Sequence, residues 1–238
     1  FADEKNLYEA DAICVYPCRL DDGKQVEMAI RTMACFKSFK WKPIMIVVDF
    51  HSTGGSKLTY RDFLKNTAID WGLSQDELIF TSEAREDWYT EVPYEDTMSI
   101  MRLANVFIMP SASESYSLIT QEAGIDKCIV VLNQDFPPFR DIFGTNAIYR
   151  RYSSTIDILA DLKEMGDGRT NTVYGPKDIS DDERKTWEKR YHTETAGMII
   201  ERLQNYQDHA MSSYLKKYRS LDAIFHRELE PLFFSEVK

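Results

Sequence analysis

Residues 106–122 read VFIMPSASESYSLITQE, and this stretch decides the fold. It opens with four apolar residues, Val106 to Met109, as expected for a strand that is covered on both faces. A polar, serine-rich turn follows, and Ser117 to Gly124 then has the pattern of a helix. A buried strand that leads through a short turn into a helix is the repeating unit of an α/β protein with a parallel sheet.

The same alternation continues on both sides of this stretch. We expect strands at Ala12–Tyr16, Ile44–Val48, Leu78–Thr81, Val106–Met109, Ile129–Leu132 and Ala147–Tyr149. Helices are expected at Lys24–Phe39, Thr59–Trp71, Tyr94–Ala104, Ser117–Gly124 and Ser154–Met165. The sequence therefore predicts an α/β fold, a Rossmann-like doubly wound parallel sheet of about six strands with a C-terminal helical tail.

The tail begins after Met165, where glycines and Pro176 mark a loop region. Ser180 and Glu183 have the spacing of a capping box, which predicts that a helix starts there. The helical pattern runs to about Arg227, and we expect it to be interrupted near Gly197. We divide the chain into a Rossmann-like domain, residues 1–166, and a C-terminal segment, residues 167–238, that packs on this domain or on another domain outside the sequence.

Composition excludes several classes of protein. The 238 residues carry a formal net charge of −10, which argues against broad capture of nucleic acid or anionic lipid. The apolar runs fall far short of the roughly 18 residues of a membrane span. The first ten residues lack the pattern of a secretory signal. Because the first residue is Phe1 and not Met, we expect a chain that begins within a longer protein or whose start was removed. The four cysteines lie in apolar stretches without the spacing of a zinc or redox motif, and we predict them to be buried and reduced, as in a cytoplasmic protein.

The first candidate site is the segment PCRLDDGK, residues 17–24, which follows the first predicted strand. Ligands of open α/β sheets bind at the carboxyl ends of strands. Arg19 and Lys24 provide two cations there that could clamp a diphosphate. The alternative is that both are solvated surface charges.

The second candidate site lies in the stretch quoted first. If the helix begins near Ser117, the amides of Ser117, Leu118 and Ile119 would face a phosphate. Glu122 could then accept two hydrogen bonds from a ribose diol, and Glu114 in the preceding loop could hold sugar hydroxyls. The alternative is that Glu114 is only a cap or a surface residue of the loop and that Glu122 lies on a solvated helix face.

Together the two segments resemble the donor-binding domain of the family 4 retaining glycosyltransferases of the GT-B fold. The resemblance covers about residues 12–165 and rests on Arg-Leu-x-x-x-Lys after the first strand, then Pro-Ser-x-x-Glu with a second glutamate eight residues later. It implies that Arg19 and Lys24 hold the donor diphosphate, that Glu114 is the catalytic residue on the donor sugar, and that Glu122 binds the ribose. The diphosphate would be stabilised by cations and helix amides, so we expect no metal or other cofactor.

The chain departs from the family pattern at three places. After the second strand it has Val48-Asp49-Phe50-His51 where the family often has a glycine-rich turn. It has Ser115-Tyr116-Ser117 where Gly-Phe-Gly is usual, and Gln25 where glycine is usual.

We expect Trp88 and Tyr89 to be packed loop aromatics, the alternative being that they stack on the donor base.

The function expected from this resemblance is transfer of a hexose from a nucleoside diphosphate sugar to an unknown acceptor hydroxyl. An N-terminal acceptor domain would be needed as well, because this chain has room for one Rossmann-like domain. Two alternatives stay open. One is another GT-B enzyme, such as a nucleotide-sugar epimerase or a glycogen-synthase-like polymerase, and the other is a non-catalytic nucleotide-binding α/β domain.

Overall fold

The computed structural model describes residues 1–50, 57–111, 114, 116–152, 180–205, 215–216 and 224–230. Within them, six strands form one sheet in which every neighbouring pair is parallel. The strand order is β3-β2-β1-β4-β5-β6. The strands are β1 Ala12–Arg19, β2 Pro43–Phe50, β3 Leu78–Phe80, β4 Val106–Met109, β5 Ile129–Asn133 and β6 Ile148–Arg150. The predicted doubly wound α/β fold is confirmed.

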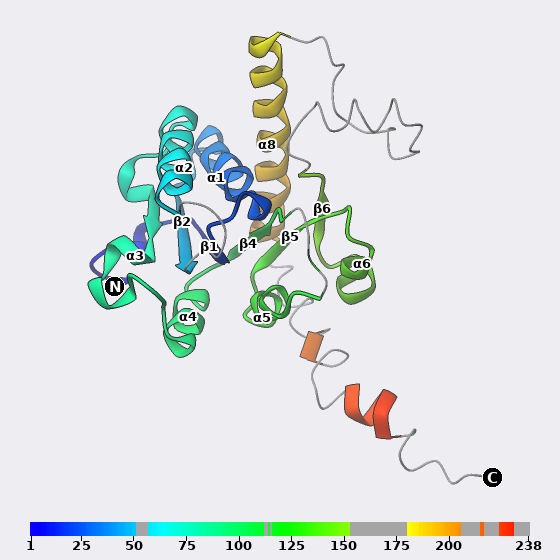
Figure 1. The fold of residues 1–238 in the computed structure, drawn as a ribbon. Coiled ribbons are helices and arrows are strands. Elements are labelled where there is room, and N and C mark those ends of the chain that lie inside the picture. The colour runs from blue at the N-terminus through cyan, green and yellow to red at the C-terminus, as the bar shows by residue number, and fades with distance from the viewer. Residues whose placement is uncertain are drawn as a thin grey trace, which may run out of the picture.

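Helices cover both faces of this sheet. Figure 1 shows α1, α2 and α8 on one side of the strands and α4 and α5 on the other. The helices are α1 Val26–Cys35, α2 Lys57–Trp71, α3 Thr81–Ala84, α4 Tyr94–Met101, α5 Leu118–Ile125, α6 Pro137–Phe143 and α8 Asp181–Gln204. A turn of π-helix, Phe225–Leu229, is described near the C-terminus. Because β1 leads toward one edge of the sheet and β4 toward the other, the chain reverses its direction of winding between these two strands.

The first strand is longer than predicted. It pairs with β2 in register as far as Arg19, opposite Phe50, so Arg19 is the last strand residue and not part of a following loop. The next helix also starts later than predicted, because Asp22–Lys24 forms a 3-10 turn and Gln25 then adopts a left-handed conformation with φ 50°. The α-helix itself therefore begins at Val26.

The short helix α3 was not predicted, and it depends on a buried carboxylate. Asp49, at the end of β2, accepts hydrogen bonds from the Thr81 hydroxyl at 3.1 Å and from the Ser82 amide at 2.9 Å. The Ser82 hydroxyl also donates to Asp49, at 2.6 Å. The Asp49 carboxylate of β2 thus accepts hydrogen bonds from donors at the start of α3. Local sequence patterns do not reveal this contact, because Asp49 lies far from α3 in sequence. Thr81, predicted in the third strand, consequently opens this helix.

The C-terminal helix α8 begins as predicted, with the capping box of Ser180 and Glu183 in place. The predicted interruption near Gly197 is wrong, since α8 continues without a break to Gln204. A Cβ atom at residue 197 would lie 3.3 Å from the ring of Phe39, so the glycine serves close packing. The side chains of Ala196, Ile199 and Ile200 join the hydrophobic core of the sheet domain.

The core also contains the four cysteines, all of them buried and none in a disulfide bond, as predicted. Burial raises the pKa of the Cys14 thiol to about 12. Among the described residues, no helix is long and apolar enough to span a membrane. The helix predicted at Ser154–Met165 lies outside the described residues, and so does most of the tail beyond Asn205.

Candidate functional site

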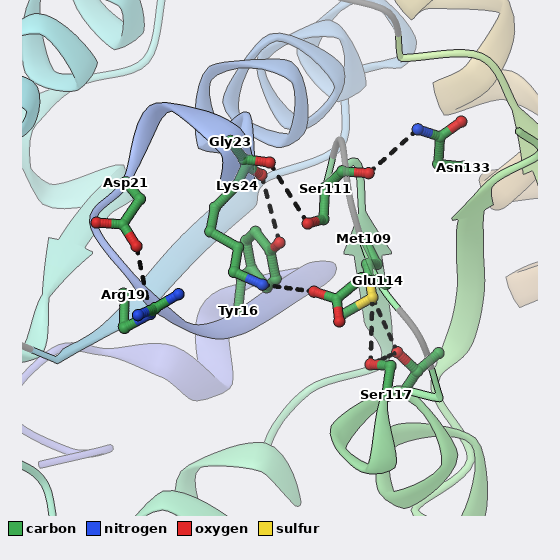
Figure 2. Close-up of polar contacts among 11 residues, drawn as sticks. Tyr16, Arg19, Asp21, Gly23, Lys24, Met109, Ser111, Glu114, Ser117 and Asn133 are labelled. Carbon is green, nitrogen blue, oxygen red and sulfur yellow. Dashed lines mark hydrogen bonds and ion pairs between the residues drawn. The ribbon is translucent and has the colours of Figure 1, made fainter. Parts of the chain in front are cut away.

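The two candidate segments meet where the winding reverses, at the carboxyl ends of β1 and β4. Figure 2 shows Lys24 reaching from the 3-10 turn after β1 to Glu114, which follows β4. The Lys24 Nζ atom lies 2.5 Å from the Glu114 Oε1 atom, although the two residues are 90 positions apart in sequence. Both side chains are largely buried, with 22% and 16% of their surface exposed. The structure therefore brings together a predicted diphosphate-binding residue and the predicted sugar-binding residue.

Arg19 lies beside this pair and is also held by a carboxylate. Its Nε atom lies 3.2 Å from the Asp21 Oδ2 atom, and about half of the arginine side chain is exposed. Each of the two predicted phosphate-binding cations thus contacts an acidic side chain (Figure 2). Asp21 was not among the predicted site residues, because its role depends on the tight turn after β1.

Backbone contacts hold the turn in place. The Tyr16 hydroxyl donates to the carbonyl of Lys24 at 3.3 Å, and the Ser111 hydroxyl donates to the carbonyl of Gly23 at 3.4 Å. The Asn133 side-chain amide in turn donates to the carbonyl of Ser111 at 3.1 Å. These hydrogen bonds therefore link the ends of β1, β4 and β5 to one another near Lys24 (Figure 2).

The helix predicted to face a phosphate begins one residue later than predicted. Ser117 is its N-cap and has a left-handed conformation, with φ 47°. The Ser117 hydroxyl turns away to Thr120, 2.7 Å between the two oxygen atoms, and to the sulfur of Met109. It makes no capping bond to the helix backbone. Leu118 and Ile119 open the first turn, so their amides are at the free end of the helix.

The second glutamate, Glu122, has its own partner. The Tyr94 hydroxyl, at the first residue of α4, donates to the Glu122 Oε1 atom at 2.9 Å. This hydrogen bond raises the pKa of the Tyr94 phenol, so the phenol stays protonated and donates at neutral pH. Tyr94 was not a predicted site residue. An exposed tyrosine at a helix start has no local signal that distinguishes it from an ordinary surface residue.

Gln25, in the turn after β1, is buried and has a left-handed backbone conformation. It is 3% exposed, its φ is 50°, and its Oε1 atom has no hydrogen-bond partner among the described residues. Gln25 and Ser117 both stand where the family pattern has glycine, and both adopt the left-handed conformation that glycine enters without steric cost.

An apolar pocket of about 260 Å³ adjoins these residues. Pro17, two residues before Arg19 in β1, and Ile119, three residues before Glu122 in α5, both line it. The other lining residues are Phe50, Glu91, Val92, Tyr94 and Thr97. Trp88 is not among them. It is buried against Phe1 and stacked under Arg85, in agreement with the expected packing role.

A second pocket, of about 450 Å³, lies at the opposite end of the sheet, where Pro43 begins β2 and Leu78 begins β3. None of the predicted site residues lines it. The described residues contain no group of three or more His, Cys, Asp or Glu side chains that could hold a metal ion.

Comparison with known proteins identifies the fold. No protein-family model and no curated protein sequence matches the chain. A sucrose-phosphate synthase structure from Thermosynechococcus elongatus is similar to it, with a TM-score of 0.50, 16% sequence identity, and coverage of 93% of this chain and 48% of that chain. The chain therefore shares the GT-B type of fold.

Two further solved structures are similar at lower TM-scores. The trehalose-6-phosphate phosphatase N-terminal domain of Candida albicans has a TM-score of 0.49 and 15% identity, with 90% of this chain and 43% of that chain covered. An E. coli trehalose-6-phosphate structure bound with UDP-2-fluoro glucose has a TM-score of 0.48 and 17% identity, with 90% and 46% covered. The chain thus spans less than half the length of the structures it matches.

Proposed function

We propose that this chain is the donor-binding half of a retaining glycosyltransferase of family 4, which transfers a hexose from a nucleoside diphosphate sugar to an acceptor hydroxyl. One observation carries the proposal. Arg19, Lys24 and Glu114 converge at the point where the winding of the sheet reverses, which is where open α/β sheets bind ligands.

The two ion pairs provide a mechanism for donor binding. The donor diphosphate replaces Glu114 as the partner of Lys24 and Asp21 as the partner of Arg19. Glu114 is thereby released to accept hydrogen bonds from hydroxyls of the donor sugar. The amides of Ser117, Leu118 and Ile119 supply further donors to the phosphates.

The same groups assist the chemical step. The diphosphate gains negative charge as the glycosidic bond breaks, and fixed cations and amides stabilise that charge more than they stabilise the bound donor. Glu122 binds the ribose, and the apolar pocket beside Tyr94 takes the base. An N-terminal domain binds the acceptor and supplies the rest of the catalytic site. The buried cysteines, none of them in a disulfide bond, favour the cytoplasm as the location of the enzyme.

A thermal-shift panel with UDP, GDP, ADP and CMP and their sugar conjugates tests donor binding. A ligand at about 100 times its dissociation constant adds roughly 2.7 kcal/mol of stability. We expect a clear shift with one nucleotide, its loss in Arg19→Ala, and its retention in Arg190→Ala, which removes an exposed arginine of α8. A panel without any shift would contradict the proposal for this chain.

The role of Glu114 is tested in the full-length enzyme. Glu114 forms an ion pair with Lys24, so Glu114→Ala makes the Lys24 ammonium group available to the diphosphate. We expect nucleoside diphosphate binding to be retained while the rate of sugar transfer falls by orders of magnitude. Equal losses of nucleotide binding and of sugar transfer would contradict the proposed contact between Glu114 and the donor sugar.

A further inference from the structure

The hydrogen bond between Tyr94 and Glu122 joins two helices at the edge of the apolar pocket. Tyr94 opens α4 and Glu122 lies in α5, and Tyr94 is itself one of the residues that line the pocket. Ile119, on the same side of α5 as Glu122, lines the pocket as well. The carboxylate of Glu122 therefore lies beside the pocket, and its orientation is set from the opposite helix.

The hydrogen bond also determines which atoms of Glu122 are available. A carboxylate has about four acceptor positions on its two oxygens, and Tyr94 occupies one of them on Oε1. The remaining positions can accept from two neighbouring hydroxyls. Without Tyr94, a glutamate on the first turns of a surface helix would sample several rotamers, and ordering it on ligand binding would cost entropy.

We propose that Tyr94 is a positioning residue that holds Glu122 ready to accept both hydroxyls of a ribose 2′,3′-diol, so that the pair selects ribonucleotides over 2′-deoxyribonucleotides. The inference rests on the proposed function and adds to it a residue that neither the sequence pattern nor the family resemblance indicates. The hydroxyl of Tyr94 acts through Glu122, while its ring closes the pocket beside the base.

The test compares dissociation constants for the ribonucleoside diphosphate found in the thermal-shift panel and for its 2′-deoxy analogue. A hydrogen bond to a charged group typically changes an affinity by about tenfold or more. We expect the wild-type chain to favour the ribonucleotide by about tenfold. Tyr94→Phe keeps the ring and removes the hydroxyl, and we expect it to reduce that ratio severalfold while the affinity for the deoxy analogue stays within about twofold.

Three further variants make the test specific. Glu122→Ala abolishes the preference, and adding Tyr94→Phe to it has no additional effect, because the tyrosine acts through the glutamate. Tyr8→Phe, at an exposed tyrosine of the N-terminal segment, leaves the ratio unchanged. Melting temperatures without ligand show that each variant is folded.

The possible failures are distinguishable. If the wild-type chain binds the ribonucleotide and Tyr94→Phe keeps the wild-type ratio, the positioning role is wrong and the donor site stands. If the wild-type chain binds the two nucleotides equally, selection of the diol is wrong. If it binds no nucleoside diphosphate, the proposed function and this inference both fail.

Discussion

The carboxylate of Asp21 is paired with one of the two cations of the proposed donor site. It lies 3.2 Å from the guanidinium of Arg19, in the same place where a diphosphate would have to approach. An exposed ion pair of this kind contributes only about 1 kcal/mol or less, so a diphosphate with two charges can displace it. In the proposed site, Asp21 would therefore compete with the donor diphosphate for Arg19 without excluding it.

We predict that Asp21→Asn increases the affinity for nucleoside diphosphate by about two- to tenfold, because it removes a competitor for Arg19 and a repulsive charge. Titration calorimetry measures this change directly. Asp22→Asn is the matched control, since it removes the same charge one residue further along the chain, at the start of the 3-10 turn Asp22–Lys24. An affinity that Asp21→Asn leaves unchanged, or changes no more than Asp22→Asn does, would contradict the prediction.

A single hydroxyl serves two partners at the start of α1. The Tyr60 hydroxyl accepts from the Val26 amide at 3.2 Å and donates to the Glu27 carboxylate at 2.6 Å. Burial raises the pKa of Glu27, and the hydrogen bond from Tyr60 partly offsets that rise. Tyr60 therefore satisfies one of the free amides of the helix and a half-buried acid together.

We predict that Tyr60→Phe lowers the free energy of unfolding by about 1–3 kcal/mol at pH 7, because it leaves two polar groups without their partner. Urea unfolding measures the loss. Tyr94→Phe, at a tyrosine that is 66% exposed, is the matched control and should cost little stability. Equal losses in the two variants would mean that burial does not decide the contribution of the hydroxyl.

At the scale of elements, helix α8 packs closely against the 3-10 turn that follows α1. Gly197 lies against Phe39, the last residue of a 3-10 turn, Phe36–Phe39. An added Cβ would need the ring to move by a few tenths of an ångström. The ring of Phe39 is 41% exposed and so has room to move outward.

We predict that Gly197→Ala stabilises the chain by up to about 1 kcal/mol, because alanine is favoured over glycine inside a helix and the small shift of an exposed ring costs less. Gly197→Leu should destabilise it, since a larger side chain cannot be accommodated by such a shift. Urea unfolding of both variants measures the difference. A loss of stability in Gly197→Ala would show that Phe39 is held more rigidly than its exposure indicates.

At the scale of the whole molecule, His192 joins three helices on one face of the sheet. Its Nδ1 atom lies 2.8 Å from the Thr32 hydroxyl of α1, and its ring meets the ring of Trp71 of α2 edge to face. Because the Thr32 hydroxyl donates to the carbonyl of Met28, we assign the proton of this contact to His192 Nδ1. Burial, together with the charges of Arg31 and Arg150, lowers the pKa of His192 to about 3.

This pKa predicts how stability depends on pH. The folded state keeps His192 neutral, whereas the unfolded chain takes up a proton below about pH 6.5, so the stabilisation is complete above that pH and decreases as the pH falls toward 3. We expect His192 to add up to about 1.4 kcal/mol per pH unit to the slope of unfolding free energy in this range. Urea unfolding between pH 7 and 5 should show a shallower slope in His192→Asn than in the wild type. A wild-type slope in His192→Asn would contradict the prediction.

The sequence alone determined the elements that depend on neighbouring residues. Apolar runs such as Val106–Met109 specify buried strands because each of their faces must be covered, and the capping box of Ser180 and Glu183 specifies the start of α8 because both partners lie within one turn. The order of these elements was sufficient to predict the doubly wound sheet and to place Arg19, Lys24 and Glu114 near its carboxyl edge.

Only the tertiary structure decided how the side chains are paired. Lys24 meets Glu114 across 90 residues, and Tyr94 reaches Glu122 from another helix, because the sheet places β1 beside β4 and the crossover helices beside each other. The late start of α1 and the small helix α3 have the same origin, since a left-handed Gln25 and a buried Asp49 are held by long-range contacts. Local sequence patterns carry no information about such contacts, because their partners are brought together only when the sheet assembles.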